Sequence, residues 1–416
     1  EKISLGNHFH NVLCLSVAKG MDITMNIVII PAFFQTKKNP TIGSFFLDQA
    51  KALRKSGHQV SILYCDTYSV KCIRDYAAYS EDALSETDGI KIYRKRVFCP
   101  LKHGMEGHRT QFTEGIIQLF EQYLSGEKVD IFHAHCCVWA GYAAMRLSDR
   151  TKIPYFITEH ATLFALHKDK IRKGNERYIR QAFERAAKVV CVSRAFAKLI
   201  ARYRTAGDIE VIGNVVNFGQ FQPKQSAPHS GMRFLTICYM NTGDQLRKKG
   251  MDILLKAWRD FSRKQNGVKL IVGGGGQAAQ KAVEWCKEYG IEESVEFVGA
   301  LSREQVAAQM QACDAFVLPS RYETFGVVYI EAMACGKPVI AAANGGPDDF
   351  VKDFNGILIA PECVGELTEA MQYMAEHREC YEPQRIAEFV KERFSEQAVA
   401  AQLSELYMAN HNRRNR

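Results

Sequence analysis

Short apolar runs alternate along the chain with longer segments in which apolar residues recur on one face of a helix. The first run, 26–31 (NIVIIP), is apolar at almost every position, and the next segment, 45–56, is predicted to be a helix that ends at Gly57. Apolar strands separated by helices are typical of a parallel sheet covered on both faces. Further strands are predicted at 60–65, 91–98, 130–133, 154–158, 189–193, 234–238, 268–272, 295–298, 315–318 and 338–342. Further helices are predicted at 140–147, about 170–187, 250–264, 277–289, 302–312 and 326–335.

The alternation pauses once, in a polar segment at 213–223 that is rich in Asn, Gly and Gln, and then restarts. This pattern predicts two doubly wound, Rossmann-like α/β domains that face each other across a cleft, with a hinge near 214–224. In such sheets ligands bind at the carboxyl ends of the strands. The expected parts are an extension of unclear role at 1–24, domains at 25–215 and 216–392, and a final helix at 393–416 that packs back on the first domain.

Length and composition fit this organisation. The chain has 416 residues, of which 47% are hydrophobic and 24% charged, which is enough for two buried cores. No apolar run approaches the roughly 18–20 residues of a membrane-spanning helix, and the stretch 12–18 is not followed by a cleavage-site pattern. The 13 cysteines are odd in number and scattered, unlike the framework of a small secreted domain. We therefore expect a reduced, cytoplasmic protein.

The net charge of +8 is unevenly distributed. Basic residues crowd the segment 168–185 and the end of the chain, 411–416. Two interpretations stay open: a solvated helix face with a frayed terminus, or attraction to phosphate, either on anionic lipid or on a phosphorylated acceptor. Nucleic acid is not expected as a partner, because neither interleaved aromatic residues nor a zinc-ribbon pattern accompanies the charge.

The segment 319–338 (PSRYETFGVVYIEAMACGKP) carries the clearest chemistry. A predicted strand ends at Leu318, and a helix is expected to begin near Thr324, which is a plausible N-cap, with Gly326 allowing a ligand to approach the first amides. Two carboxylates, Glu323 in the loop and Glu331 along the helix, would then grip two parts of an elongated ligand. Two glutamates near one helix are also common without any function, so the pair alone does not decide.

Further motifs give the segment its meaning. Glu323-Thr-Phe-Gly followed by Glu331-Ala-Met-Ala-Cys-Gly resembles the E-x7-E signature of retaining glycosyltransferases with the GT-B fold, and is most similar to family four of the nucleotide-sugar glycosyltransferases. The resemblance extends from Asn26 to about Tyr407. Supporting motifs occur in the family's order: Gly43, 130–135 (DIFHAH), 158–160 (TEH), Val192-Ser193, Asn214, Lys249-Gly250, the glycine run 273–276 and Asn355-Gly356.

The resemblance implies roles on the donor side. The carboxy-terminal domain would bind the nucleotide sugar and the amino-terminal domain the acceptor. Glu331 would hold the ribose hydroxyls, and Glu323 would contact the transferring sugar. The amides of Phe325 and Gly326 would face the sugar or the phosphates.

The resemblance also implies roles around the leaving group. Lys249 would neutralise the departing diphosphate in place of a metal ion, and Gly43 would bring its amide there from the opposite domain. His135 would line the reacting centre, and His160 is a weaker candidate nearby. With Glu323, His135 and Lys249 are the catalytic candidates, and none of them is assigned as a nucleophile.

The sequence departs from the family at one point. Members usually carry an arginine five or six residues before the lysine, where this chain has Gly243 and Asp244. Arg247 or Lys248 is the candidate replacement, and the sequence alone does not choose between them.

Two other motifs give weaker evidence of a ligand or metal site. The run Gly273–Gly276 lacks the pattern of a nucleotide-triphosphate loop, so Gly274 is either a donor contact or part of a structural turn. His133, His135, Cys136 and Cys137 form a metal-like cluster, but neighbours on a strand point to opposite faces. Neither a metal nor another cofactor is expected.

The sequence thus predicts a hexosyltransferase that retains configuration and moves sugar to an acceptor hydroxyl. The expected acceptor is a lipid-linked glycan of surface polysaccharide assembly, with peripheral contact at the inner face of an anionic membrane. The alternatives are a sugar-nucleotide epimerase or phosphorylase on the same fold, or a non-catalytic nucleotide-sugar-binding subunit.

Overall fold

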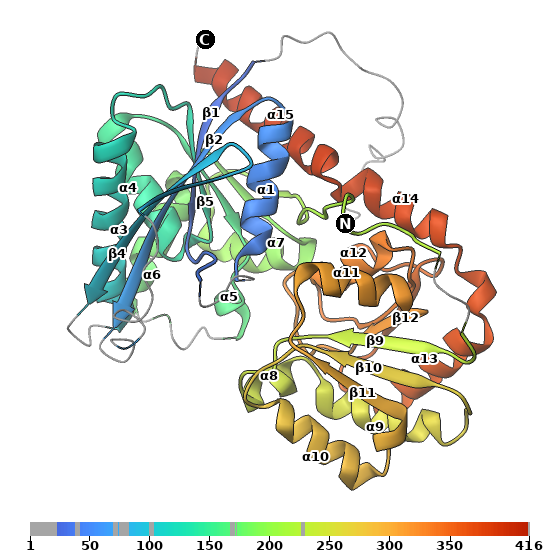
Figure 1. The fold of residues 1–416 in the computed structure, drawn as a ribbon. Coiled ribbons are helices and arrows are strands. Elements are labelled where there is room, and N and C mark those ends of the chain that lie inside the picture. Colours follow the sequence, from blue (N-terminus) through green and yellow to red (C-terminus); the bar gives the residue numbers. More distant parts are fainter. Residues whose placement is uncertain are drawn as a thin grey trace, which may run out of the picture.

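The computed structural model contains two α/β units, each built around one sheet (Figure 1). It describes residues 23–37, 42–69, 74, 83–99, 104–166, 171, 173–225 and 229–414. The extension 1–22, residues 38–41 and the basic positions 168, 170 and 172 therefore lie outside the described residues. The cysteines inside these ranges are free thiols.

In the described part of the first unit, eight strands form a sheet in the order β3-β4-β2-β1-β5-β6-β7-β8. Neighbouring strands are parallel except β3, which runs antiparallel to β4 at the edge. The strands are β1 (Asn26–Pro31), β2 (Gln59–Ser69), β3 (Leu84–Thr87), β4 (Ile90–Cys99), β5 (Ile131–His135), β6 (Tyr155–Glu159), β7 (Lys188–Cys191) and β8 (Ile209–Val211). The helices are α1 (Ser44–Lys55), α3 (Gly104–Tyr123), α4 (Tyr142–Thr151), α5 (Leu163–Leu166), α6 (Lys173–Arg185) and α7 (Arg194–Ile200), with a π-helical turn at Cys137–Gly141.

The second unit holds, within the described chain, a six-stranded parallel sheet in the order β11-β10-β9-β12-β13-β14. Its strands are β9 (Arg233–Ile237), β10 (Lys269–Gly273), β11 (Val295–Gly299), β12 (Ala315–Leu318), β13 (Val339–Ala342) and β14 (Gly356–Ile359). Its helices are α8 (Gly243–Lys248), α9 (Met251–Ser262), α10 (Ala279–Tyr289), α11 (Arg303–Ala312), α12 (Val327–Ala334), α13 (Val364–Glu376) and α14 (Pro383–Phe394). The prediction of two parallel-sheet α/β domains is confirmed.

The central strands are buried on both faces, as their continuous apolar sequences require. Ile27, Val28, Ile29 and Ile30 of β1 are each at most 2% exposed. The helices cover them with apolar stripes, such as the buried face of α9, which runs from Met251 to Phe261. Burial of apolar surface on both sides of each sheet is the main favourable contribution to this fold.

The chain passes between the units twice, at neighbouring points. The amide of Val216 donates to the carbonyl of Phe394 over 2.8 Å. Gly213 lies against the Phe394 and Phe325 rings, where a Cβ atom would collide with both. After this crossing α15 (Glu396–Arg414) runs back along the first unit, where Lys55 of α1 pairs with Glu396 over 2.9 Å (Figure 1).

The prediction of Thr324 as the N-cap of the helix after β12 is wrong, whereas the predicted range 326–335 begins one residue from the observed start. Helix α12 begins at Val327, and its N-cap is Gly326, whose φ of 94° lies in the left-handed region. The Tyr329 ring occupies the space that a side chain at Gly326 would need. Thr324 is therefore in the loop, where its carbonyl accepts a hydrogen bond from Ser193 of the first unit over 2.7 Å.

Candidate active site

Four of the predicted site residues lie beside the two places where the strand order reverses. In the first sheet β1 stands between β2 and β5, and in the second β9 stands between β10 and β12. Connections leave such a point in opposite directions, which opens a crevice at the carboxyl ends of the strands. Gly43 follows β1 and His135 ends β5, whereas Lys249 follows β9 and Glu323 follows β12. Residues distant in sequence thus gather at the same kind of position in both units.

Lys249 and Glu323 form a direct ion pair. The Nζ atom of Lys249 lies 2.5 Å from Oε1 of Glu323, and the hydroxyl of Ser320 donates to the same oxygen over 2.9 Å. The side chains are 22% and 10% exposed. Burial alone would lower the pKa of Lys249, but the Glu323 carboxylate more than offsets it and raises that pKa. Lys249 is therefore a fixed cation next to the loop before α12.

The neighbours of Lys249 differ in their exposure. Arg247 is exposed, and its carbonyl accepts a hydrogen bond from Arg321. Lys248 is half-buried; burial lowers its pKa, and both Glu323 and Lys249 act on its charge. The short helix α8, which is not among the predicted helices, is capped by Thr242 and places these residues in its last turn.

Glu331 lies one turn into α12, facing the first unit. Its Oε1 atom is 3.2 Å from Nη2 of Arg303, which is also 3.2 Å from Oδ2 of Asp48 on α1. Burial raises the pKa of Glu331 to about 7; Arg303 acts to lower it and Asp48 to raise it. The proposed ribose-binding carboxylate is thus buried at the junction of the two units.

Three histidines stack at the ends of β5 and β6. Nδ1 of His135 lies 3.1 Å from Nε2 of His160, and the ring of His135 packs on those of His133 and Phe46 at centroid distances of 4.8 Å. Burial is the main cause that lowers the pKa of His160 to about 3 and that of His135 well below its ordinary value. Both imidazoles are therefore neutral at physiological pH.

One nitrogen of each ring is left for a ligand. Within the described residues, Nε2 of His135 and Nδ1 of His160 are buried and make no hydrogen bond to protein. Buried polar atoms in folded proteins are nearly always satisfied, so an atom of this kind points to a ligand or water. His133 differs, because its two nitrogens contact Tyr407 of α15 at 2.6 Å and Thr158 at 2.8 Å.

A buried carboxylate holds the loops that carry these histidines. Glu159 accepts hydrogen bonds from the amides of Cys137, His160 and Ala161 over 2.7, 2.9 and 2.8 Å. Burial raises its pKa to about 7 despite these bonds. In the part of the chain that the structure describes, His, Cys, Asp and Glu side chains form no group of three or more that could hold a metal ion.

The glycines close to the site are required by backbone geometry. Gly43 (φ 69°) is the N-cap of α1 and packs against the carbonyl of Phe33. Gly274 (φ 116°) leaves no space for a Cβ atom beside the carbonyl of Cys238, and its amide donates to Gly299 over 2.7 Å. These contacts explain the glycine run as a tight turn, and a role for Gly274 at the donor stays a prediction.

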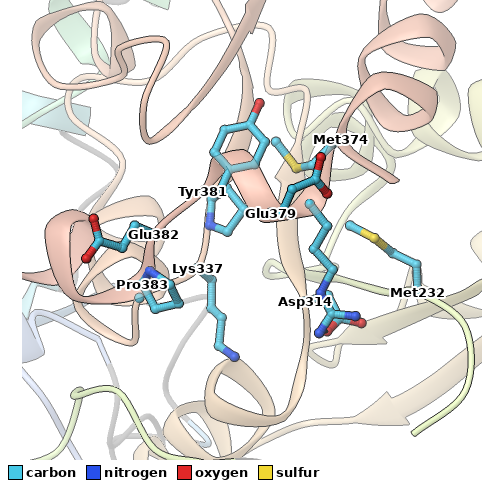
Figure 2. Close-up of a pocket in the computed structure, with 11 residues that line it drawn as sticks. Met232, Asp314, Lys337, Met374, Glu379, Tyr381, Glu382 and Pro383 are labelled. Atoms are coloured by element: carbon cyan, nitrogen blue, oxygen red, sulfur yellow. Dashed lines mark ion pairs between the residues drawn. The ribbon is translucent and has the colours of Figure 1, made fainter. Parts of the chain in front are cut away.

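One pocket of the second unit lies away from these residues. A pocket of about 520 Å³ is lined by Met232, Asp314, Lys337 and Tyr381 among others (Figure 2). Met232, Asp314 and Lys337 precede β9, β12 and β13, so this pocket lies at the amino ends of the strands. It is on the edge of the sheet opposite to Lys249 and Glu323, and it holds none of the predicted site residues.

Four residues of the site were not predicted. Arg303, Asp48, Ser320 and Glu159 touch predicted residues or hold their loops. Glu159 and Ser320 stand inside motifs noted in the sequence, 158–160 and 319–338. Arg303 is signalled by the capping box Ser302-Arg303-Glu304-Gln305, which puts it at the first helical position.

Comparison with known proteins agrees with this architecture. Residues 42–220 match the family described as Glycosyltransferase Family 4, and residues 237–393 match Glycosyl transferases group 1. A sucrose-phosphate synthase structure from Thermosynechococcus elongatus superposes with a TM-score of 0.75 at 20% identity, covering 92% of this chain and 98% of that one. Anabaena HepE in complex with UDP-glucose gives a TM-score of 0.68 at 19% identity, over 92% and 100%. The family matches thus indicate a glycosyltransferase, and the superpositions show the two-domain GT-B fold.

Relatives in sequence are glycosyltransferases. An uncharacterised glycosyltransferase of Methanocaldococcus jannaschii is 23% identical over 75% of this chain and 79% of its own length. A D-inositol 3-phosphate glycosyltransferase of Mycobacterium sp. (strain JLS) is 30% identical over 64% of this chain, a match that spans 63% of that relative. The chain belongs to the GT-B glycosyltransferases and resembles family four. None of its described helices combines the length and the apolar character needed to cross a membrane.

Proposed function

We propose that this glycosyltransferase moves a hexose-type sugar from a nucleotide-sugar donor to an acceptor hydroxyl, with retention of configuration and without a metal ion. The observation that carries the proposal is the buried contact between Lys249 and Glu323 at the strand-order reversal of the second unit. A fixed cation at that position suits a diphosphate that gains charge as it leaves. A carboxylate beside it suits the hydroxyls of the sugar being transferred.

The chemistry requires one bond to break and one to form. The bond between the anomeric carbon and the diphosphate oxygen breaks, the acceptor oxygen bonds to the anomeric carbon on the same face, and the acceptor proton passes to the departing phosphate. Lys249 stabilises the charge on the phosphate, and Glu331 accepts hydrogen bonds from the ribose. His135, neutral and with Nε2 unused by the described protein, contacts a hydroxyl of the sugar.

For the donor, a uridine nucleotide is the first choice. The structure of Anabaena HepE contains UDP-glucose, and its chain is covered completely by the superposition. We therefore take UDP-glucose as the lead donor, with other nucleotide sugars as comparisons.

For the acceptor, we propose a lipid-linked glycan at an anionic membrane surface. The support is the basic segment 168–185, although two of its arginines are partly neutralised, Arg180 by Glu176 and Arg185 by Asp149. Relatives named D-inositol 3-phosphate glycosyltransferase make a soluble phosphorylated acceptor the competing outcome.

A thermal-shift panel of nucleotide sugars tests the donor. A ligand at about 100 times its dissociation constant stabilises the native state by about 2.7 kcal/mol, which is a shift of several degrees. We expect UDP-glucose to raise the melting temperature of the wild type and to have little effect on Glu331→Ala. No shift with any nucleotide sugar, or an equal shift in both proteins, would contradict the proposal. Turnover of the nucleotide sugar without any acceptor would favour an epimerase instead.

Liposome co-sedimentation tests the acceptor side. We expect binding to anionic vesicles at low salt that is lost at high salt, because surface attraction of this kind is screened. Neutral vesicles are the matched control. Absence of binding at low salt, together with transfer to an inositol phosphate, would replace the lipid-linked acceptor with a soluble one.

A further inference from the structure

Arg303, on helix α11 of the second unit, contacts helix α1 of the first unit. Its Nη2 atom lies 3.2 Å from Asp48 of the first unit and 3.2 Å from Glu331 of the second. Its Nη1 atom donates to the hydroxyl of Ser44 over 3.1 Å. The side chain is 24% exposed, and its guanidinium lies 5.4 Å from the centroid of the Phe221 ring, in the segment that joins the units. One side chain thus contacts both units and their connection.

The position of Arg303 is fixed by the helix start. Ser302 accepts a hydrogen bond from the amide of Gln305 over 3.3 Å, and the Gln305 side chain accepts from the amide of Ser302 over 2.8 Å. This capping box holds the first turn of α11 and aims its first residue across the cleft. Arg303 is therefore placed before any ligand arrives.

The charges around Arg303 explain why a cation is needed. Asp48 and Glu331 approach the same nitrogen, so without it two buried carboxylates would face each other across the cleft. Burial already raises the pKa of both, and Arg303 acts on both to lower it. The other charges that act on Asp48 are Lys51 and Lys55 of α1 and Glu396 of α15, of which Lys51 pairs with Asp88 and Lys55 with Glu396. Cys335 on α12 stays neutral, because burial raises its pKa to about 12.

We propose that Arg303 is a positioning residue for donor binding. Its guanidinium stands between Asp48 and Glu331 and pairs with both, so that the two units can close on each other although each brings a carboxylate to the contact. The proposal rests on the proposed function, because it takes Glu331 as the carboxylate that receives the ribose hydroxyls. Without Arg303, at a pH high enough for both carboxyls to be ionised, repulsion between the two carboxylates would open the cleft and move Gly43 and His135 away from the donor. Removing the charge of Asp48 would then restore closure.

The test is a double-mutant cycle with UDP as the probe, measured by calorimetry. We expect Arg303→Gln to weaken UDP binding about tenfold, since like charges in a poorly solvated site are costly. Asp48→Asn alone should have a smaller effect, and Arg303→Gln/Asp48→Asn should recover most of the lost affinity. Arg303→Lys should bind better than Arg303→Gln. Arg259→Gln, which removes a surface arginine paired with Asp260, is the matched control.

Small-angle scattering on the ligand-free proteins gives an independent readout. We expect Arg303→Gln to increase the radius of gyration and the double variant to return to the wild-type value. A variant that was merely misfolded would not be rescued by Asp48→Asn. If the double variant stays as open and as weak as Arg303→Gln, or if Arg303→Gln matches the wild type in both measurements, the inference is wrong. Failure of the wild type to bind UDP would count against the proposed donor alone, because the scattering result still decides the role of Arg303.

Discussion

The two walls of the cleft differ in charge. On the wall formed by the first unit, His135 and His160 are buried imidazoles whose pKa values are lowered by burial, and they are neutral at physiological pH. On the wall formed by the second unit, Lys249 and Glu323 are held as an ion pair. At these positions the first wall offers uncharged hydrogen-bonding atoms and the second offers fixed charge, whereas the Asp48 carboxylate of the first unit is paired with Arg303.

This difference fits the proposed division of labour. Fixed charge belongs where a diphosphate leaves and negative charge grows, because preorganised charges in a poorly solvated site act most strongly there. Transfer of a sugar also develops positive character at the anomeric carbon. A protonated histidine beside that carbon would oppose it, whereas a neutral imidazole can bind a hydroxyl without that penalty.

Replacing Lys249 should produce the largest effect on catalysis, because it removes the cation of the charged wall. We expect Lys249→Ala to lower kcat by roughly 10²–10³-fold, the usual loss when one preorganised charge-stabilising group is removed. The donor KM should change less, because the charge acts mainly on the leaving diphosphate. Initial rates at varied donor concentration measure both values.

Two controls accompany this substitution. Lys249→Arg keeps the charge and should retain more activity than Lys249→Ala. Because Lys249→Ala leaves Glu323 buried without its cation, the melting temperature must be recorded to show that the variant is folded. A folded Lys249→Ala protein with unchanged kcat would refute the assigned role.

Replacing Glu331 should have the second largest effect, and Glu331 should also make nucleotide affinity depend on pH. A carboxyl whose pKa is about 7 is ionised only above that pH, so nucleotide affinity should fall as the pH is lowered through 7. We expect Glu331→Gln to bind UDP about tenfold more weakly at high pH, which corresponds to about 1.4 kcal/mol. Calorimetry across the pH range would measure this. The terminal phosphate of UDP also titrates, near about 6, so the difference between the two proteins isolates the carboxyl.

The same ionisation predicts an effect on stability. A carboxyl with a raised pKa contributes stability below its ordinary value of 4.5 and loses it as the pH rises toward 7. Glu331→Gln has no such group, so its melting temperature relative to the wild type should rise between about pH 5 and about pH 8. A relative melting temperature that falls over this range would mean that Glu331 is not the buried acid described.

Sequence patterns were sufficient for the central strands and for the residues that follow them. The runs at 26–31 and 315–318 are apolar because both faces of those strands are buried, so they can be predicted as strands from the sequence. Edge elements were missed for the converse reason: β3 and β8 are short and have no fully buried residue. The N-cap of this helix was placed at Thr324 and not at Gly326, because a glycine N-cap gives no side-chain signal, whereas Thr324 suggested one.

Contacts between the units were beyond sequence analysis. Asp48 and Arg303 lie on helices of different units, α1 and α11, and periodicity describes only which face of its own helix each residue occupies. The pairing of Arg303 with Glu331 depends on how the units approach each other. Lys249 and Glu323 could be proposed together only through the family resemblance, and the ion pair gives that proposal a physical basis.

His135 tests the neutral wall and should have a moderate effect. We expect His135→Ala to lower kcat/KM roughly tenfold, the value of one or two neutral hydrogen bonds. The shape of the pH profile around neutral pH should not change, because burial lowers the pKa of His135 well below its ordinary value of 6.5. Loss of an ionisation near neutral pH in the variant would show that His135 carries a charge during the reaction.

A second buried histidine serves as the control. His58 contacts Ser404 of α15 at 2.8 Å, away from the strand-order reversal. We expect His58→Gln to lower the melting temperature while the folded enzyme keeps its kcat/KM. An equal kinetic loss in both variants would assign the His135 effect to general destabilisation.

The smallest effects are expected at Arg247 and Lys248, the two candidates for the arginine that this sequence lacks before Lys249. Lys248 is half-buried, and the charges of Glu323 and Lys249 both affect its pKa. Arg247 is exposed. We expect Lys248→Ala to weaken UDP binding roughly fivefold and Arg247→Ala less than about twofold, since charges in water contribute little. Raising the salt concentration should reduce the Arg247 effect further and leave most of the Lys248 effect, because buried charges are screened less. The opposite order would mean that α8 rearranges when the donor binds and turns Arg247 toward the phosphates, so that the charged wall is completed only in the complex.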